Sequence, residues 1–153
     1  MKFILSMICL SFMLSQNLTT ADFTYKSKAN AYFRKDVSKN VIKRVYNQLA
    51  KKKEMVNKKG RLRTAPSLIG GVVKQPNWTT YNGPTVATNV SFRLRIGKKG
   101  KPDIIILKTD APKEAYKIII NELLKANFNP GISNKKGKPV RSWMSLSEYY
   151  KNY

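Results

Sequence analysis

Residues 90–108 read VSFRLRIGKKGKPDIIILK, and this stretch decides the fold. Apolar residues alternate with serine and arginine over residues 90–96, which is the period of a strand with one buried face. Residues 97–100 form a short basic turn that contains two glycines. The apolar run at residues 104–107 has the length and the β-branched composition of a second strand. The pattern therefore predicts a β-hairpin.

The spacing of apolar residues then changes to that of a helix. Over residues 115–126 the apolar side chains fall on one helical face, and Asp110 is expected to cap the helix at its start. Pro130 should end it, because proline cannot continue a helix. After a second basic turn, residues 139–146 are expected to form a third strand. We therefore expect an α+β fold over residues 85–153: a β-β-α-β unit whose small antiparallel sheet packs on one helix.

Residues 22–84 are expected to precede this unit as a lead-in. Valine and leucine recur at helical spacing from Val37 to Leu49, which predicts a basic amphipathic helix over about residues 36–58, followed by an irregular segment. Lysines occupy the other face of this helix. Such a helix can lie on an anionic membrane or pack on its own domain, and the narrow apolar stripe favours packing.

The first residues have the composition of a secretory signal peptide. Lys2 precedes an apolar run at residues 3–14, and a polar segment with small residues ends at Ala21. The run is shorter than the roughly twenty residues that span a bilayer. We therefore expect residues 1–21 to be removed and the mature protein to be periplasmic or secreted. An uncleaved signal would instead anchor the protein in the inner membrane.

The chain lacks most of the side chains that catalysis uses. It has no histidine and eight acidic residues, and its single cysteine, Cys9, lies in the expected signal peptide. Glu114 and Glu122 would lie two turns apart on the predicted helix, which is too far to share a proton. The glycine–lysine turns do not have the spacing of a phosphate loop. We therefore expect no enzymatic activity, no cofactor, no metal and no small-molecule substrate.

The charge of the chain is strongly positive. Its 30 basic residues and eight acidic residues give a formal net charge of +22. Such a charge favours anionic partners, which include membrane surfaces, acidic proteins and polyanionic polymers. A lysine-rich proteome would produce the same excess without any selected partner, so the charge alone leaves both interpretations open.

Two short segments after the predicted helix resemble motifs of a known family. Residues 126–130 read ANFNP, an A-x-F-x-P segment that closes the helix, and residues 137–140 read GKPV, a G-x-P-V segment that opens the last strand. With the expected order of elements, residues 85–150 resemble the C-terminal domain of the TonB family. The residues that carry the resemblance are structural ones: Phe128, Pro130, Gly131, Gly137, Pro139 and Val140.

The resemblance implies a binding function. Domains of this family lie in the periplasm and engage outer-membrane transporters by adding a transporter peptide as a strand to an exposed sheet edge. This mode relies on main-chain hydrogen bonds. The implied edge is the last strand, residues 140–149, with the contact residues Arg141, Trp143, Ser145 and Tyr149.

The chain departs from the TonB family in two ways. It has no long proline-rich spacer, and a cleaved signal would leave no anchor to couple the domain to a proton-driven motor. We therefore expect a binding module for an envelope protein or an outer-membrane transporter. The related TolA family would supply a different envelope partner, and a homodimer formed by exchange of the last strand stays open.

The alternative function is that of a secreted polyanion binder for nucleic acid, lipopolysaccharide or glycosaminoglycan. It is motivated by the charge and by tyrosines among lysines: Tyr25, Tyr32, Tyr46 and Tyr81. Affinity for a polyanion should fall steeply with salt, which separates it from strand addition.

Overall fold

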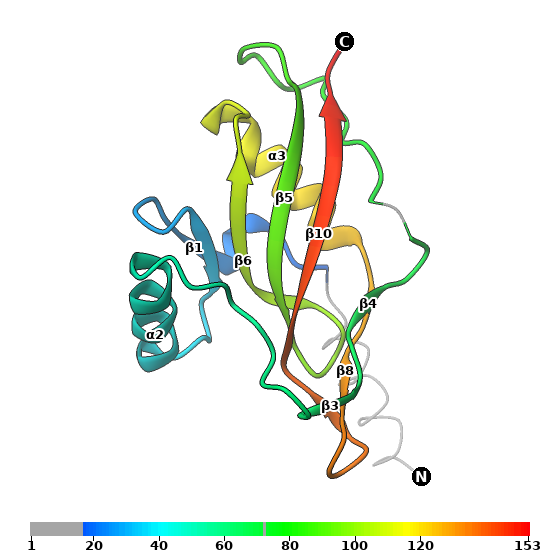
Figure 1. The fold of residues 1–153 in the computed structure, drawn as a ribbon. Helices are drawn as coiled ribbons and strands as arrows, with labels where there is room; N and C mark the ends of the chain where they lie inside the picture. The colour runs from blue at the N-terminus through cyan, green and yellow to red at the C-terminus, as the bar shows by residue number, and fades with distance from the viewer. Residues whose placement is uncertain (1–16, 72) are drawn as a thin grey trace, which may run out of the picture.

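A computed structural model describes residues 17–71 and 73–153, which form a mixed α/β fold with two α-helices and mostly antiparallel strands. The main sheet has five strands, each antiparallel to its neighbours (Figure 1). In spatial order they are β1 (Phe23–Lys26), β2 (Ala31–Arg34), β6 (Pro102–Thr109), β5 (Ala87–Ile96) and β10 (Ser142–Lys151). The edge strands of this sheet are therefore β1 and β10.

β5 and β6 form the predicted hairpin. Their turn requires glycine at position 100, because Gly100 has a φ of +80° and a Cβ there would collide with the carbonyl oxygen of Phe128. Lys101 donates from Nζ to the carbonyl oxygens of Leu124 and Ala126 at 3.2 and 2.8 Å. The hairpin turn and the end of the following helix are thus fastened to each other.

That helix, α3 (Lys113–Lys125), covers one face of the sheet. Its buried side chains pack against the inward residues of β5, so the alternation at residues 90–96 faces this core. Pro112 occupies the N-cap position and no side chain makes a capping hydrogen bond there. The predicted cap at Asp110 is therefore wrong, because the helix begins two residues later than such a cap requires.

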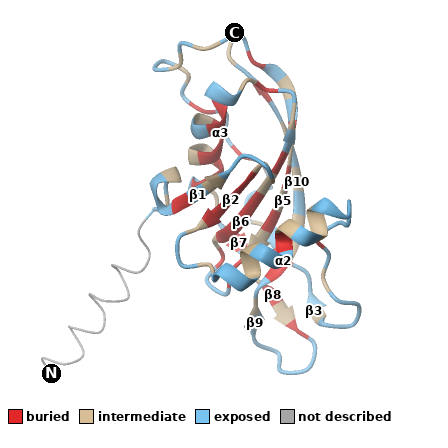
Figure 2. Ribbon diagram, turned by 90° about the vertical axis from the view of Figure 1, so that its left-hand side faces the viewer, coloured by how far each residue is buried: buried red, intermediate tan, exposed pale blue. Residues whose placement is uncertain are grey.

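A second helix, α2 (Lys39–Ala50), covers part of the opposite face (Figure 2). Adjacent side chains of β6 lie on opposite faces of the sheet. Ile105 belongs to the core under α3, whereas Ile104 packs with Val45 of α2 and with Phe33. The sheet is thus covered by α3 on one face and by α2 on part of the other. Burial on both faces also explains the unbroken apolar run of β6.

α2 is shorter than the helix predicted for residues 36–58. Ser38 caps its start by accepting a hydrogen bond from the N–H of Val41 at 3.3 Å. Beyond its end, Lys52 has a φ of +54°, a left-handed conformation that helices cannot continue through. The chain then leaves the helix axis and buries Met55 against the sheet.

The predicted lead-in, residues 22–84, contributes two strands to the main sheet. β1 and β2 form a hairpin, and β2 pairs with β6, with Tyr32 opposite Ile105. The expected boundary near residue 85 therefore does not separate two structural units. The sequence gives no period here because three successive residues of β2, at 31–33, are all buried.

The predicted third strand is divided into two strands. β9 (Pro139–Val140) lies in a small separate sheet, and the chain enters the main sheet at Ser142, the first residue of β10. The N–H of Gly131 donates to Oγ of Ser142 at 3.2 Å, so the two sheets meet where the chain crosses between them. The small sheets are formed by β3 (Leu62–Thr64), β8 (Gly131–Ser133) and β9 (Pro139–Val140), and by β4 (Ser67–Leu68) and β7 (Phe128–Asn129).

Within residues 17–71 and 73–153, neither helix is long and apolar enough to cross a membrane. The signal peptide predicted at residues 1–21 lies mostly outside the described residues. Its expected last residues, Thr20 and Ala21, are described, and together with Asp22 they form a 3-10 turn, η1 (Thr20–Asp22), which Thr19 caps.

Candidate functional site

β10 is the edge strand beside which a partner strand could be added. It pairs with β5 along its whole length, from Ser142 opposite Ile96 to Lys151 opposite Ala87. Successive residues of an antiparallel strand direct their backbone groups to alternate sides. The odd-numbered residues of β10, beginning with Trp143, direct theirs away from β5.

Two side-chain amides occupy the ends of this open side. Asn57 donates from Nδ2 to the carbonyl oxygen of Trp143 at 2.8 Å and accepts from the N–H of Trp143 at 2.7 Å. Gln75 donates to the carbonyl oxygen of Tyr149 at 2.6 Å and accepts from the N–H of Lys151 at 3.3 Å. Each amide therefore makes the hydrogen bonds that a residue of a neighbouring strand would make.

Ser145 and Ser147 form the open part of the edge between these two amides. Among the residues that the structure describes, none makes a hydrogen bond to the outward N–H or C=O of either serine. Both serines are exposed. We name residues 145–147 the edge window, because unpaired backbone groups at a sheet edge can pair with a further strand.

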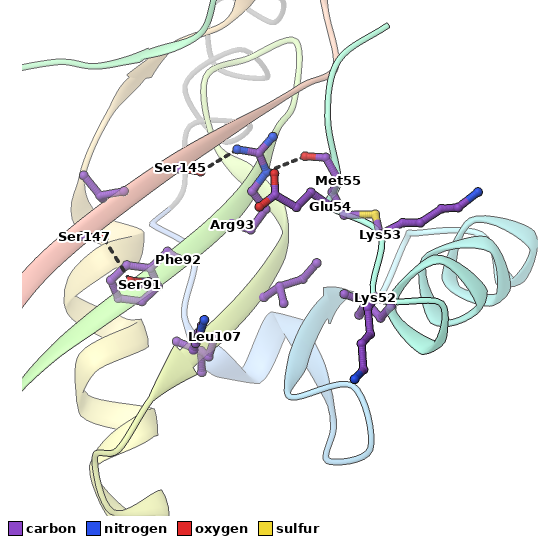
Figure 3. Close-up of a pocket in the computed structure, with 14 residues that line it drawn as sticks. Lys52, Lys53, Glu54, Met55, Ser91, Phe92, Arg93, Leu107, Ser145 and Ser147 are labelled. Carbon is purple, nitrogen blue, oxygen red and sulfur yellow. Dashed lines mark hydrogen bonds between the residues drawn. The ribbon is translucent and has the colours of Figure 1, made fainter.

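A groove lies beside the edge window, between the face of the sheet and the chain that follows α2 (Figure 3). Its volume is about 530 Å³. The hydroxyls of Ser91 and Ser147 lie 3.0 Å apart on its floor. We name it the basic groove, because its charged lining residues are Lys52, Lys53, Glu54, Arg93 and Lys108.

Arg93 of β5 lies at the centre of the basic groove. Its Nε donates to the carbonyl oxygen of Met55 and its Nη1 donates to Oγ of Ser145 (Figure 3). The guanidinium thus extends from β5 to the Ser145 side chain of the edge window. Burial lowers the pKa of Arg93, and the carboxylate of Glu54 acts in the opposite direction. No carboxylate in the described part of the chain forms an ion pair with it.

Arg95, two residues further along β5, has a carboxylate partner. Its Nε and Nη2 donate to the two carboxylate oxygens of Asp103, both at 2.8 Å. Arg141 adds a third contact, from Nε to Oδ2 at 3.3 Å. A shift in the β5–β6 register between Arg95 and Ile96 accompanies the contact, which is how a bulge redirects a side chain. The Asp103 side chain is 2% exposed.

The four predicted contact residues lie in different surroundings. Arg141 precedes β10 and contacts the buried carboxylate of the neighbouring network. Trp143 packs with the apolar cluster under α2, while the side chain of Tyr149 is exposed. Backbone groups of both aromatic residues are already bound by the two amides. Of the four, Ser145 alone lies in the edge window.

The residues of the two short motifs have structural positions. Phe128 is 3% exposed and belongs to the core under α3. Gly131 approaches Ser142 so closely that a Cβ would collide with its hydroxyl, and Gly137 has a φ of +64° in the β8–β9 turn. The remaining three lie in or beside the short strands: Pro130, Pro139 and Val140.

Sequence reasoning missed the most informative residues of the site. Asn57 and Gln75 bind backbone groups 86 and 74 positions away in the sequence, so no local pattern identifies them. The sequence does contain a signal for Arg93. The alternation of β5 places Arg93 and Arg95 together on the face opposite the α3 core. What distinguishes the two arginines is the position of Asp103 across the hairpin.

Within the described residues, no three histidine, cysteine or carboxylate side chains are grouped to hold a metal ion. Comparison of the chain with family models, with curated proteins and with solved structures finds no match. The functional interpretation therefore depends on the edge window and the basic groove.

Proposed function

We propose that this protein is a non-enzymatic binding module that takes an extended segment of a cell-envelope protein as a strand beside β10. The observation that supports the proposal is the edge window, where Ser145 and Ser147 direct backbone groups outward with no partner among the described residues. Main-chain hydrogen bonds supply the affinity in this mode of recognition.

The order of elements also supports this proposal. β5, β6, α3 and β10 follow one another in the order that the TonB C-terminal resemblance implies. On this basis we propose that residues 85–150 correspond to the β-β-α-β unit of that family. We further propose that residues 1–21 export the chain to the periplasm or beyond, where the partner is an outer-membrane transporter or another envelope protein.

The two amides set the length of the added strand. With Asn57 and Gln75 in place, a partner can pair with Ser145 and Ser147 and no further. Each backbone hydrogen bond contributes about 1 kcal/mol net, so this short pairing gives modest affinity by itself. Displacing either amide would lengthen the pairing at the expense of two existing hydrogen bonds.

The variant Ser147→Pro tests the edge directly. The N–H of Ser147 points away from β5, so proline there removes a donor from the open side and none from the β5 ladder. The probes are nine-residue blocked peptides, one alternating threonine with valine and others copied from plug-side segments of outer-membrane transporters. We expect them to slow hydrogen exchange at the amides of residues 145 and 147 in the full chain, and not to bind the proline variant.

Ser147→Ala is the matched control, because it removes the hydroxyl and keeps the N–H. It should bind the peptides as the unmodified chain does. Equal binding by the proline variant would contradict strand addition. Peptide or heparin-fragment binding that perturbs lysine side chains alone and disappears with salt would favour the polyanion alternative.

A further inference from the structure

The basic groove has the shape and charge of a site for an anionic group. Its lining residues carry four cations, Lys52, Lys53, Arg93 and Lys108, against the single carboxylate of Glu54. In Figure 3 the lysines after α2 extend outward at its rim, while Arg93 lies inside, between Met55 and Ser145. The central cation is thus held by two hydrogen bonds, and the outer cations lie at exposed positions.

The guanidinium of Arg93 is positioned by two neutral acceptors and keeps unused donors. A guanidinium has five N–H groups, and the bonds to Met55 and Ser145 take two of them. No described residue accepts from its Nη2. An arginine fork matches the two oxygens of a carboxylate, and such charge-assisted pairs are stronger than neutral hydrogen bonds.

The basic groove lies next to the edge window, because Ser145 and Ser147 line both. Residues that lie directly opposite each other on paired strands place their side chains on the same face. The side chain of a partner residue opposite Ser145 would therefore lie on the face of Arg93, whose Nη1 already contacts the Ser145 hydroxyl. The Ser91 and Ser147 hydroxyls offer further donors next to that position.

The groove lacks a platform for nucleic-acid bases. Sequence-tolerant binding of single strands depends on bases stacking on exposed aromatic rings. Among the described lining residues the one aromatic is Phe92, which is 2% exposed. Its ring packs edge-on against Tyr150 in the core, with centroids 6.3 Å apart.

We infer that the basic groove binds the carboxylate of an aspartate or glutamate side chain on the segment that pairs with β10. This inference rests on the proposed function for the source of the carboxylate, and the groove itself is defined independently of it. The partner is therefore an acidic extended segment, and the groove supplies specificity where the backbone pairing supplies little.

The experiment compares three blocked nine-residue peptides of alternating threonine and valine, with glutamate, glutamine or lysine at the central position. Binding to the full chain is measured by NMR on backbone amides and on the Nε–H signals of arginine. We expect the glutamate peptide to bind about tenfold more tightly than the glutamine peptide, which corresponds to one charge-assisted pair. The lysine peptide should bind most weakly.

Arg93→Gln should reduce the preference for glutamate to within about twofold, and Arg93→Lys should leave it in between, because lysine keeps the charge and loses the fork. Arg44→Gln is the matched control, since Arg44 is an exposed cation of α2 outside the groove. It should retain the full preference. The Nε–H signal of Arg93 should shift with the glutamate peptide and that of Arg95 should not.

The outcomes separate the two proposals. Protection at Ser145 and Ser147 by all three peptides without a glutamate preference overturns the groove inference and leaves strand addition standing.

If no peptide affects β10, the strand-addition proposal is wrong, and titration with glutarate then tests whether the groove binds a carboxylate. A glutarate-dependent shift at Arg93 that is absent at Arg95 would sustain the carboxylate site, and no shift would overturn it.

Discussion

Arg93 and Arg95 lie two residues apart on the same face of β5, and their surroundings differ. Arg95 is paired through two hydrogen bonds with a carboxylate that is 2% exposed. Arg93 is held by a carbonyl and a hydroxyl, beside a groove that is open to solvent. An arginine paired with a buried carboxylate stabilises the fold, whereas a positioned arginine without a carboxylate partner can still bind an external acid.

The largest expected effect concerns the acid of this pair. Asp103→Asn should lower the free energy of unfolding by about 3 kcal/mol, because it leaves Arg95 facing a neutral group in a partly buried site. Urea unfolding followed by circular dichroism measures the change. Asp110→Asn removes the same charge from an exposed loop and should change stability by less than about 0.5 kcal/mol. Equal effects of the two variants would remove the distinction between the arginines.

Arg93→Gln should cost less stability than the loss of Asp103. Its two hydrogen bonds go to neutral acceptors, so we expect a decrease of about 1 kcal/mol in the free energy of unfolding. Urea unfolding under identical conditions gives the ranking. A loss as large as that of Asp103→Asn would make Arg93 a structural residue like Arg95.

Arg141 should contribute less again. Its side chain is 52% exposed and its contact with Asp103 is 3.3 Å long, so Arg141→Gln should lower stability by about 0.5 kcal/mol. The difference from the unmodified chain should shrink in high salt, because exposed charges are screened. Thermal unfolding at low and high salt checks this. A loss of stability that does not depend on salt would show that Arg141 contributes in the same way as the Arg95–Asp103 pair.

The smallest expected effect is at Asp36, which lines a small cavity with Arg95 and Arg141. A hydrogen bond from Arg34 lowers the pKa of the Asp36 carboxyl. The unfolded carboxyl, with a pKa of about 3.9, binds its proton first as pH falls, so the stabilisation is complete above that pH and is lost below it. Asp36→Asn should cost about 0.3 kcal/mol near neutral pH and nothing in strong acid. Urea midpoints across pH measure it, and a difference that grows in acid would contradict the sign.

Sequence reasoning could predict the coarse fold because the signals are local. The alternation at residues 90–96 and the helical spacing at residues 115–126 each fall within one element, and the structure has a strand and a helix there. The two strands at the start of residues 22–84 were not predicted, and the reason is physical. β2 is buried on both faces by long-range packing, and a doubly buried strand has no amphipathic period.

The candidate site could be predicted only in part. The last strand was expected to be an edge, and β10 does lie at the edge of the sheet. Its length and its two amide partners depend on where residues 57 and 75 fall in space, which no local pattern encodes. The contrast between the arginines depends on Asp103, which lies across the hairpin beside the register shift between Arg95 and Ile96.

The strand order also has a consequence for how the chain folds. β5 and β6 are close in sequence, so their hairpin forms with little loss of loop entropy, whereas β10 must return from beyond α3. Until it does, the side of β5 that β10 will cover is itself an unpaired edge. During synthesis, which proceeds from the N-terminus, β10 is the last of the five main-sheet strands to emerge, and its pairing with β5 completes the sheet. The protein's own last strand is therefore the first to add to this sheet edge, and the proposed partner strand would be the second.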